Sequence, residues 1–358
     1  MRLISIDEAQ PGMILGKTIL REEDGQILLR SNSILKAHYI QKIKELKYEY
    51  IYILSPGENN VDPNIQPIKD ETKVKALETI KLTVEQIKKN TEINLVKIKE
   101  VITEMIDQIL NSPEVVYNLI EINQHDNYTY MHSVNVATLS LMTGSLMGLN
   151  RKNLEILGIS ALMHDLGKIL IDQSILNKSE KLEDHEYEVL KEHATKGYEL
   201  LKNGYNQSYL PAHVALQHHE RIDGSGYPKG LSGNKIHRFA KIVAVADVFD
   251  AMTSNRIYQK AQPVYLGIRE MVQNMNSKYD HEVVDYFSRI VAPYPTGTVL
   301  TMNTGDKAIV TFVSRTKCLI KFINGHYHGQ TVNLYHFSDL QVTEVIDGNH
   351  TDNSPPRL

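Results

Sequence analysis

The chain has 358 residues, of which 42% are hydrophobic and 23% are charged, and its formal net charge at pH 7 is -4. This composition is typical of a globular protein and excludes wholesale disorder, while the length predicts two or three domains. The negative net charge argues against bulk binding to nucleic acid, which needs a broad basic face. The single cysteine, Cys318, excludes an internal disulfide and a cysteine-based zinc site.

The hydrophobic residues are not arranged as a membrane segment would require. No apolar run approaches the roughly 18 residues that a membrane span needs. Asp7 and Glu8 stand where a signal peptide would keep its apolar stretch. We therefore expect a cytoplasmic protein without a membrane span.

Residues 1–62 are predicted to form a small β-rich module. Asp24-Gly25 is a turn signal between the short apolar runs at 18–20 and 27–29. Nothing catalytic stands out in this part of the chain. Several prolines then mark a linker.

Residues 63–112 are predicted to hold this linker and one long helix or a kinked pair of helices. Apolar residues follow three-four spacing along the segment, and residues 91–94 interrupt the phase. The spacing favours a helix that packs against the chain's own core. The alternative is the seam of a homodimer.

Residues 113–291 are mostly amphipathic helix and hold nearly all the unusual chemistry. Residues 292–347 have strand composition, with a tight hairpin signal at Asn324-Gly325, and predict a small β domain. Residues 348–358 are expected to form a flexible tail. The predicted fold is therefore mainly α, with an all-helical domain flanked by small β-rich N- and C-terminal modules.

His164 and Asp165 stand side by side at the end of an apolar helical run. Burying two such groups is costly unless their polarity is compensated, and a metal ion is the simplest compensation. Lys168 lies on the same helical face, where its ammonium could hold the carboxylate or a substrate phosphate. Taken alone, this short stretch is more simply a helix end with a capping Asp and a surface Lys. The interpretation therefore depends on whether other ligands exist.

Further polar residues of this kind lie elsewhere in the helical region. His132 heads an apolar stripe, and His193 follows apolar residues at three-four spacing. The pair His218-His219 lies in an apolar segment, and Asp247 lies inside an apolar run. Each residue alone is more simply a satisfied core residue. Seven together, counting His164 and Asp165, predict a metal site.

Imidazole and carboxylate ligands without thiolate suit manganese, iron, cobalt, nickel or zinc. Two such ions about 3.5–4 Å apart are a recurrent device for phosphodiester hydrolysis, because one activates a bridging water and the other takes charge on the phosphate. Residues 221–260 carry seven Lys or Arg against three Asp, and this local positive charge could hold an anionic small molecule. No Walker-type loop and no serine or cysteine nucleophile competes.

Several of these motifs follow one another in the order that a known family shows. The chain resembles the HD-GYP family, which comprises cyclic-di-GMP phosphodiesterases within the HD phosphohydrolases. The likeness runs from about 115 to 290, roughly half of the chain. The motifs that carry it are His164-Asp165 with Lys168, His218-His219-Glu220, residues 223–228, residues 246–253, and Asp126-Asn127-Tyr128-Thr129 leading to His132.

The resemblance implies an all-helical domain with two or three divalent metal ions, commonly iron or manganese, that opens cyclic di-GMP to linear pGpG through a metal-activated bridging water. Asp165 would bridge the ions and Lys168 would lie near the scissile phosphate, so these two are the implied catalytic residues. Gly226 and Tyr227 would lie in a loop beside the pocket, through which family members often contact GGDEF-type diguanylate cyclases. The implied metal ligands are His132, His164, Asp165, His193, His218, His219 and Asp247.

The chain departs from the family's pattern at two places. The family usually continues with Arg-Pro-Tyr-Arg after the Asp helix, whereas this chain keeps Arg256 as the implied substrate-binding cation and displaces the second cation to Lys260. Tyr128 stands where three-metal members have Glu. This difference predicts two ions and a reaction that largely stops at pGpG, with Glu220 or Asp250 as alternative carboxylates for a third ion.

The predicted function is therefore a metal-dependent cyclic-di-GMP phosphodiesterase. One alternative is a catalytically weak sensor that binds cyclic di-GMP, and the complete ligand set argues against it. A second is a phosphohydrolase of another cyclic dinucleotide or nucleotide, against which the Gly-Tyr-Pro loop argues. A third is a metal-stabilised scaffold whose β modules carry the function.

Overall fold

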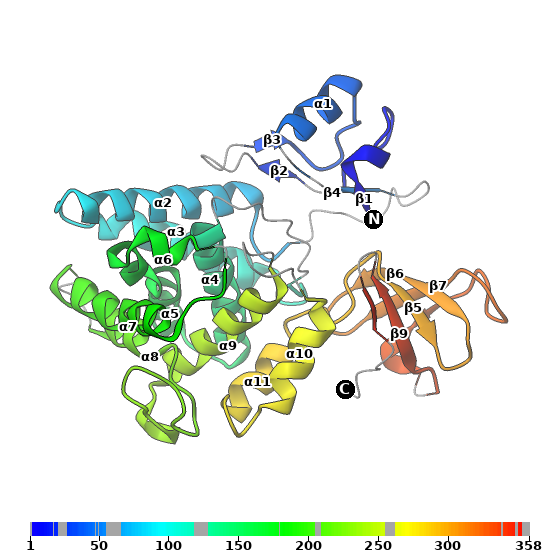
Figure 1. The fold of residues 1–358 in the computed structure, drawn as a ribbon. Helices are drawn as coiled ribbons and strands as arrows, with labels where there is room; N and C mark the ends of the chain where they lie inside the picture. The colour runs from blue at the N-terminus through cyan, green and yellow to red at the C-terminus, as the bar shows by residue number, and fades with distance from the viewer. Residues whose placement is uncertain are drawn as a thin grey trace.

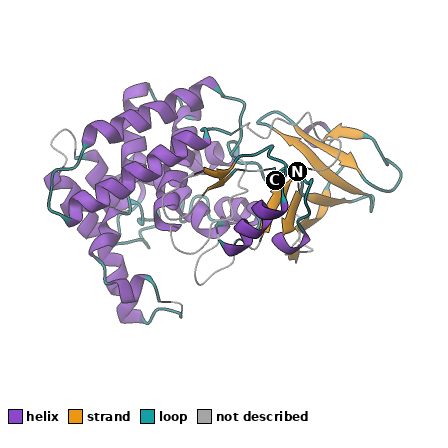
Figure 2. Ribbon diagram, turned by 90° about the horizontal axis from the view of Figure 1, so that it is seen from above, coloured by secondary structure: helices purple, strands orange, loops and turns teal. Residues whose placement is uncertain are grey.

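Helices dominate the middle of the chain, and strands lie toward its two ends (Figures 1 and 2). Three separate clusters of buried apolar side chains hold the N-terminal elements, the helices and the C-terminal sheet. The computed structural model describes residues 2–16, 18–20, 27–46, 48, 50–54, 66–117, 128–178, 180–204, 209–254, 262–337, 339–347 and 350–352.

The N-terminal elements form two small antiparallel sheets and one α-helix. Two of the strands coincide with the apolar runs predicted to be extended, and the turn signal Asp24-Gly25 lies outside the described residues. The helix was not predicted, although Ile40 and Ile43 at three-residue spacing point into its core. The elements are β1 (Arg2–Ser5) paired with β4 (Tyr50–Ile53), β2 (Ile19–Leu20) paired with β3 (Ile27–Leu29), η1 (Ile6–Glu8) and α1 (Ala37–Glu45).

The next segment holds two helices that lie side by side (Figure 1), α2 (Asp70–Lys88) and α3 (Leu95–Asn111). The chain reverses between them at Asn90, whose φ of 52° is in the left-handed region. Asn94 then caps α3 by accepting a hydrogen bond from the backbone N–H of Lys97. The kinked pair, and not the single long helix, is the correct alternative.

The apolar stripes of α2 and α3 are buried in the same core as the rest of the helical region. Ile80 of α2 and Ile102 and Met105 of α3 are almost fully buried there. Ile102 packs directly over Gly158, a residue of α5 (Arg151–Met163). The prediction that this segment packs against the chain's own core is confirmed.

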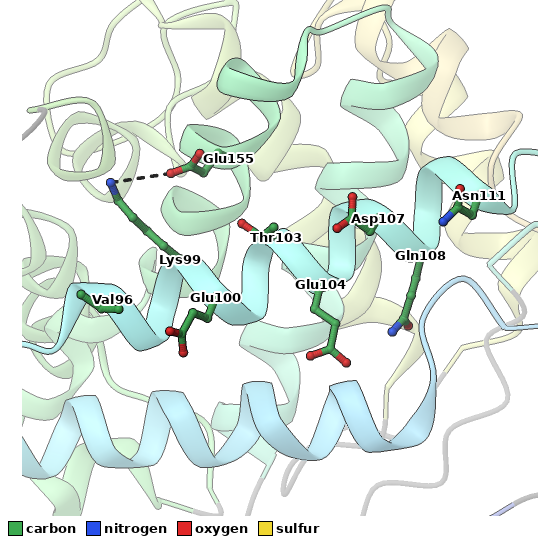
Figure 3. A pocket seen from close by; sticks show the side chains of 9 residues that line it. All are labelled: Val96, Lys99, Glu100, Thr103, Glu104, Asp107, Gln108, Asn111 and Glu155. Atoms are coloured by element: carbon green, nitrogen blue, oxygen red, sulfur yellow. Dashed lines mark ion pairs between the residues drawn. The ribbon is translucent and has the colours of Figure 1, made fainter.

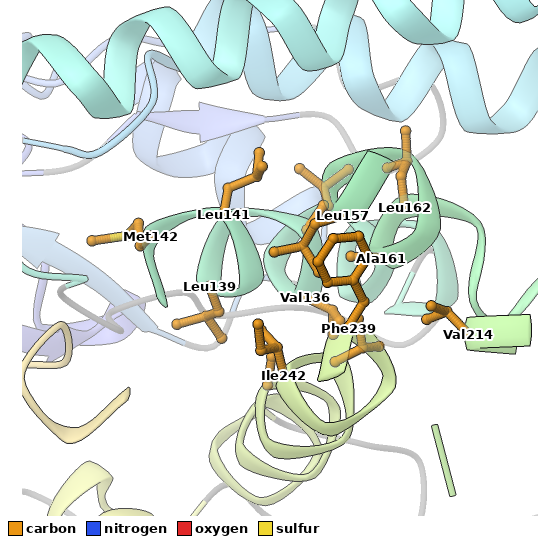
Figure 4. Close-up of a cluster of buried hydrophobic side chains, with 14 of the residues drawn as sticks. Val136, Leu139, Leu141, Met142, Leu157, Ala161, Leu162, Val214, Phe239 and Ile242 are labelled. Carbon is orange, nitrogen blue, oxygen red and sulfur yellow. The ribbon is translucent and has the colours of Figure 1, made fainter. Parts of the chain in front are cut away.

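The helical core is built around α4 (Tyr128–Leu146), which packs against α5 and α9 (Arg238–Thr253). Residues 132–144 of α4 are all buried, as expected for a helix that is surrounded by others. Figure 4 shows apolar side chains from all three helices meeting in this core. The remaining helices are η2 (Leu166–Leu170), α6 (Gln173–Leu176), α7 (Asp184–Gly204), α8 (Leu210–Gln217), η3 (Gly233–Lys235), α10 (Val264–Gln273) and α11 (His281–Ser288).

The C-terminal elements form one antiparallel sheet with the strand order β10-β9-β5-β6-β7-β8. Buried and less buried residues alternate along the first four residues of its longest strand, as expected for a sheet with one face in the core. The elements are β5 (Val299–Met302), β6 (Lys307–Val313), β7 (Cys318–Phe322), β8 (Thr331–Asn333), η4 (Leu334–His336), β9 (Val342–Asp347) and β10 (His350–Asp352), which lies in the segment predicted as a flexible tail.

Asn324-Gly325 does not form the tight hairpin turn that the sequence predicted. A loop of several residues joins β7 to β8, and Gly325 crosses over the side chain of Asp306 in it. Its φ is 76°, and a Cβ there would collide with the Asp306 carboxylate. Glycine is therefore needed at position 325 because the backbone of this longer loop passes close to the Asp306 side chain.

The C-terminal sheet packs against the helical region. Val116 and Tyr265 lie in the sheet's own core. The Arg315 guanidinium donates a 2.8 Å hydrogen bond to the carbonyl oxygen of Pro113. The sheet therefore contacts the segment before α4 and the first turn of α10. Among the described helices, none is long and apolar enough to cross a membrane.

Replacing Ile102 with Ala tests the burial of α3. The substitution removes a fully buried side chain and leaves a cavity beside Gly158, so the free energy of unfolding should fall by about 2–5 kcal/mol. Val96→Ala on the same helix is the control, because Val96 is 65% exposed and its loss should change stability by less than about 0.5 kcal/mol. Equal denaturation midpoints for the two variants would contradict this packing.

Candidate metal centre

The seven residues predicted as metal ligands meet at one place in the helical core. α4, α7 and α9 each contribute one of them, and the residues that directly follow α5 and α8 contribute a pair each. Six of the seven are buried and the other is partly exposed. Their ligand atoms form two sets, and within each set all atoms lie within 4.8 Å of one another. The first set is His132, His164 and Asp247, and the second is Asp165, His193, His218 and His219.

The two carboxylate oxygens of Asp165 face different sets. Its Oδ2 lies 3.5 Å from Nε2 of His164 and 3.7 Å from Nε2 of His132. Its Oδ1 lies 3.5 Å from Nε2 of His193 and 3.8 Å from Nε2 of His218. Asp165 therefore stands between the sets, in the position of a carboxylate that could bridge two ions.

Asp247 spans the two sets from the other side. Its Oδ1 lies 3.0 Å from Nε2 of His132, and its Oδ2 lies 3.8 Å from Nδ1 of His219. Both carboxylates thus lie within 4 Å of imidazoles of both sets.

Three of the imidazoles are oriented by their own backbone. In each, Nδ1 donates a hydrogen bond to the carbonyl oxygen three residues earlier in the chain, which leaves the lone pair on Nε2 directed into the centre. The neutral ring with this tautomer is the form that binds a metal ion. The bonds are His164 to Ala161 at 2.7 Å, His193 to Leu190 at 2.7 Å and His218 to Ala215 at 2.8 Å.

Burial keeps these rings neutral. It lowers the pKa of His218 to about 3 and also lowers the pKa of His164 and His193. Burial alone would raise the pKa of Asp165, but the nearby Lys168 ammonium holds it well below its usual range. These three neutral imidazoles therefore lie beside an ionised carboxylate.

Two positively charged groups lie beside the two carboxylates of the ligand sets. Lys168 Nζ lies 2.5 Å from Asp165 Oδ2 and neutralises one carboxylate. Burial lowers the pKa of His132, but its hydrogen bonds to Asp247 and Asp250 outweigh this and raise its pKa to about 9. The proton on Nε2 of His132 thus lies next to Asp247, at the position that a metal ion would take.

Two buried atoms of the centre are left without a hydrogen-bond partner, Nε2 of His164 and Oδ1 of Asp165. Buried polar atoms without partners are rare in native proteins. Nε2 of His164 belongs to the first set and Oδ1 of Asp165 faces the second, so a divalent cation in each set would satisfy them. The residues present therefore fit the predicted metal ions.

The Gly-Tyr-Pro loop packs directly against the ligands. The Tyr227 ring stacks on the imidazole of His219, with ring centroids 4.6 Å apart and an interplanar angle of 26°. A Cβ on Gly226 would lie 2.4 Å from Cα of Glu220, which is backbone and cannot move aside cheaply. Gly226 is therefore required by this close approach, where the sequence indicated only a turn.

Glu220 and Asp250, the alternative carboxylates for a third ion, each accept hydrogen bonds from other groups. Both Glu220 oxygens accept hydrogen bonds from backbone N–H groups of the loop, those of Lys229 and Leu231, at 2.8 Å each. Asp250 Oδ2 lies 2.6 Å from Nδ1 of His132, on the side of the ring away from Nε2. The contact of Asp250 with His132 was missed by sequence reasoning, although Asp250 is buried one turn after Asp247.

Some predicted site residues cannot be placed. Arg256 and Lys260 lie outside the described residues. Tyr128 is the first residue of α4, and its side chain also lies outside the described part of the structure. The substrate-binding roles of the two cations stay predictions.

A groove of about 670 Å³ lies along α3 (Figure 3), but none of its lining residues belongs to the metal centre. Four of the side chains that line it are acidic, and Lys99 is the only basic one. Lys99 is itself 3.7 Å from Glu155. Apart from Lys99, nothing in its lining matches the cationic contacts that an anionic substrate would need.

Comparisons with known proteins agree with this geometry. Residues 114–283 match the family model for the HD domain. A cyclic di-GMP phosphodiesterase of Pseudomonas aeruginosa is 35% identical over 59% of this chain and 51% of its own length. The 3'3'-cGAMP-specific phosphodiesterase 1 of Vibrio cholerae is 32% identical over 51% of this chain and 42% of its own length. The chain thus spans about half the length of the curated relatives it matches.

A solved structure shows the same fold. The HDG"Y"P protein from Bdellovibrio bacteriovorus superposes with a TM-score of 0.50 over 80% of this chain and 98% of its own, at 15% identity. The helical region, with its histidine and aspartate centre, is thus similar to HD domains. The match supports the resemblance to the HD-GYP family that the motifs indicated, and the mainly helical fold with small flanking sheets is confirmed.

Replacing Gly167 with Ala tests the approach between η2 and α7 that brings Asp165 to His193. A Cβ at Gly167 would lie within 2 Å of the backbone carbonyl of His193, so the two segments must separate. We expect lower thermal stability and weaker Mn²⁺ binding. Gly197→Ala is the matched control on the facing helix, because its Cβ would meet no atom closer than 3.4 Å. Equal stability and metal binding in both variants would refute this role of Gly167.

Proposed function

We propose that the chain is a metal-dependent phosphodiesterase that hydrolyses cyclic di-GMP to linear pGpG. The observation that carries the proposal is the position of Asp165, whose two oxygens face two separate ligand sets. Two ions held in this way acidify a water molecule and neutralise charge on a phosphate, which is the chemistry that phosphodiester hydrolysis needs. Iron or manganese is the proposed metal, and zinc, nickel and cobalt also suit these ligands.

The chain's own residues would orient the substrate and the ions. His132, His164 and Asp247 would hold one ion, and His193, His218 and His219 the other, with Asp165 between them. Lys168 contacts Asp165 and remains 26% exposed, so its ammonium can also reach a phosphate oxygen at the mouth of the centre. Gly226, Tyr227, Arg256 and Lys260 are the proposed substrate contacts beyond it.

A second candidate substrate is 3'3'-cGAMP, because one relative is named as specific for it. Both molecules are cyclic dinucleotides with the same type of phosphodiester bond, so the metal centre alone does not choose between them. The test is anaerobic purification with manganese or iron, followed by chromatography of each dinucleotide during turnover. Binding of cyclic di-GMP without turnover would favour the sensor alternative.

The sequence and its resemblance also make predictions about partners, assembly, location and domain boundaries. A GGDEF-type diguanylate cyclase that docks on the Gly-Tyr-Pro loop, a homodimer and a cytoplasmic location are predictions from the sequence and its resemblance. So is the division of the chain into modules at residues 62, 112, 291 and 347.

His164→Ala and Asp165→Ala should lose bound metal and phosphodiesterase activity together, since each removes a buried ligand. Metal content and cyclic di-GMP turnover are measured on the same preparations. His213→Ala is the control, because His213 lies on α8 but outside both ligand sets. Activity that survives complete chelation of the wild-type protein would refute the proposed function.

Two ions per chain and accumulation of pGpG are expected in the wild type. Glu220 and Asp250 already accept hydrogen bonds from other groups, which makes them less available to a third ion. Tyr128→Glu would supply the missing carboxylate and should add a third ion and speed the conversion of pGpG to GMP. Tyr128→Gln is the uncharged control. The idea fails if the wild type holds three ions, or if GMP accumulates as fast as pGpG disappears.

A further inference from the structure

Asp250 is a fully buried carboxylate that lies next to the metal centre but belongs to neither ligand set. Its Oδ2 accepts a 2.6 Å hydrogen bond from Nδ1 of His132. Its Oδ1 accepts hydrogen bonds from Nδ2 of Asn135 at 2.9 Å and from Oγ of Ser254 at 3.2 Å. Both oxygens are thus held, and the carboxylate has a fixed orientation.

These contacts follow from the spacing of polar residues on two facing helices. His132 and Asn135 lie three residues apart on α4, and Asp247 and Asp250 lie three residues apart on α9. Residues at this spacing project from the same helical face. Because α4 packs against α9, the four side chains form a connected row in which His132 lies between Asp247 and Asp250.

This arrangement makes His132 different from three of the other ligands. Nδ1 of His164, His193 and His218 is bonded to a neutral backbone carbonyl, whereas Nδ1 of His132 is bonded to a carboxylate. A charged acceptor forms a stronger hydrogen bond and makes the opposite ring nitrogen a better electron donor. The two ligand sets are therefore unequal.

We propose that Asp250 is a positioning residue that orients and polarises His132, and so strengthens metal binding at one of the two positions, the one formed by His132, His164 and Asp247. The inference rests on the proposed metal centre and goes beyond it. Nε2 of His132 is within 3.0 Å of Asp247 and belongs to the first set only. The effect of Asp250 should therefore be confined to that position.

Asp250→Asn is the variant that tests the hydrogen bond directly. Because Nδ2 of Asn135 donates to the Oδ1 position, the new amide would place its oxygen there and its nitrogen toward His132. An N–H facing Nδ1 favours the tautomer with the proton on Nε2, which cannot bind a metal ion. A carboxylate-to-amide change of this kind is known to invert the tautomer of a catalytic histidine in serine proteases.

Titration of the chelator-treated protein with Mn²⁺, followed by calorimetry, gives the readout. The wild type should bind in two steps, and Asp250→Asn should weaken one step by about 10–100-fold and leave the other unchanged. The double variant Asp250→Asn/Asn135→Asp should recover part of the lost affinity, because an acceptor at 135 lets the amide oxygen turn to His132. Ser254→Ala, which keeps the His132 contact, is the matched control and should change neither step.

A cycle with His132→Ala separates positioning from general support of the fold. Asp250→Asn should have no further effect on Mn²⁺ binding once His132 is absent. Equal weakening of both steps, no weakening of either, or an unchanged effect in the His132→Ala background would overturn the inference. Absence of any Mn²⁺ or Fe²⁺ binding by the wild type would instead overturn the proposed function.

The wild-type protein provides a test that needs no variant. In the protein loaded with Zn²⁺ as a diamagnetic probe, ¹⁵N NMR of the imidazoles should show the proton of His132 on Nδ1, in a stronger hydrogen bond than those of the three carbonyl-bonded rings. A His132 ring with its proton on Nε2 would contradict the proposed role even if Asp250→Asn failed to fold.

Discussion

The burial of Asp165 between two groups of imidazoles is the constraint on which the rest of the helical region depends. An ionised carboxylate in an apolar core is unfavourable unless charges or hydrogen bonds surround it. Here α5 ends just before it, η2 turns Lys168 back toward it, and Gly167 lets this turn approach His193. The helices are thus packed so closely at this point because a charged group has to be enclosed from several sides.

Backbone carbonyl groups at the ends of α5 and α8 orient two imidazoles of the same centre. The last four carbonyl groups of a helix have no intrahelical donor. Ala161 and Ala215 carry such carbonyls, and Nδ1 of His164 and of His218 donates to them. Each of these hydrogen bonds therefore satisfies one terminal carbonyl group of its helix. It also fixes the ring tautomer that directs Nε2 into the centre. These hydrogen bonds give a physical reason why His164 and His218 lie just after the last turn of their helices.

The sequence predicted well which polar side chains meet in the helical core, because seven polar residues in apolar runs are unusual as a set, although His132 or Asp247 alone indicated no site. It could not predict the contact of Asp250 with His132, since that contact depends on how α4 packs against α9. The hairpin signal Asn324-Gly325 failed for a similar reason. The glycine there is required by the Asp306 side chain, which is distant in sequence, and local turn chemistry does not reveal such a neighbour.

The loop beside the centre shows how a surface segment can be tied to buried ligands. Tyr227 stacks on His219, Gly226 lies against the backbone of Glu220, and the Glu220 carboxylate holds two N–H groups of the loop. Separating the loop from Glu220 would leave the buried carboxylate without these two donors, which is unfavourable. The loop is therefore tied to the backbone that carries His219, because Glu220 is the next residue of the chain.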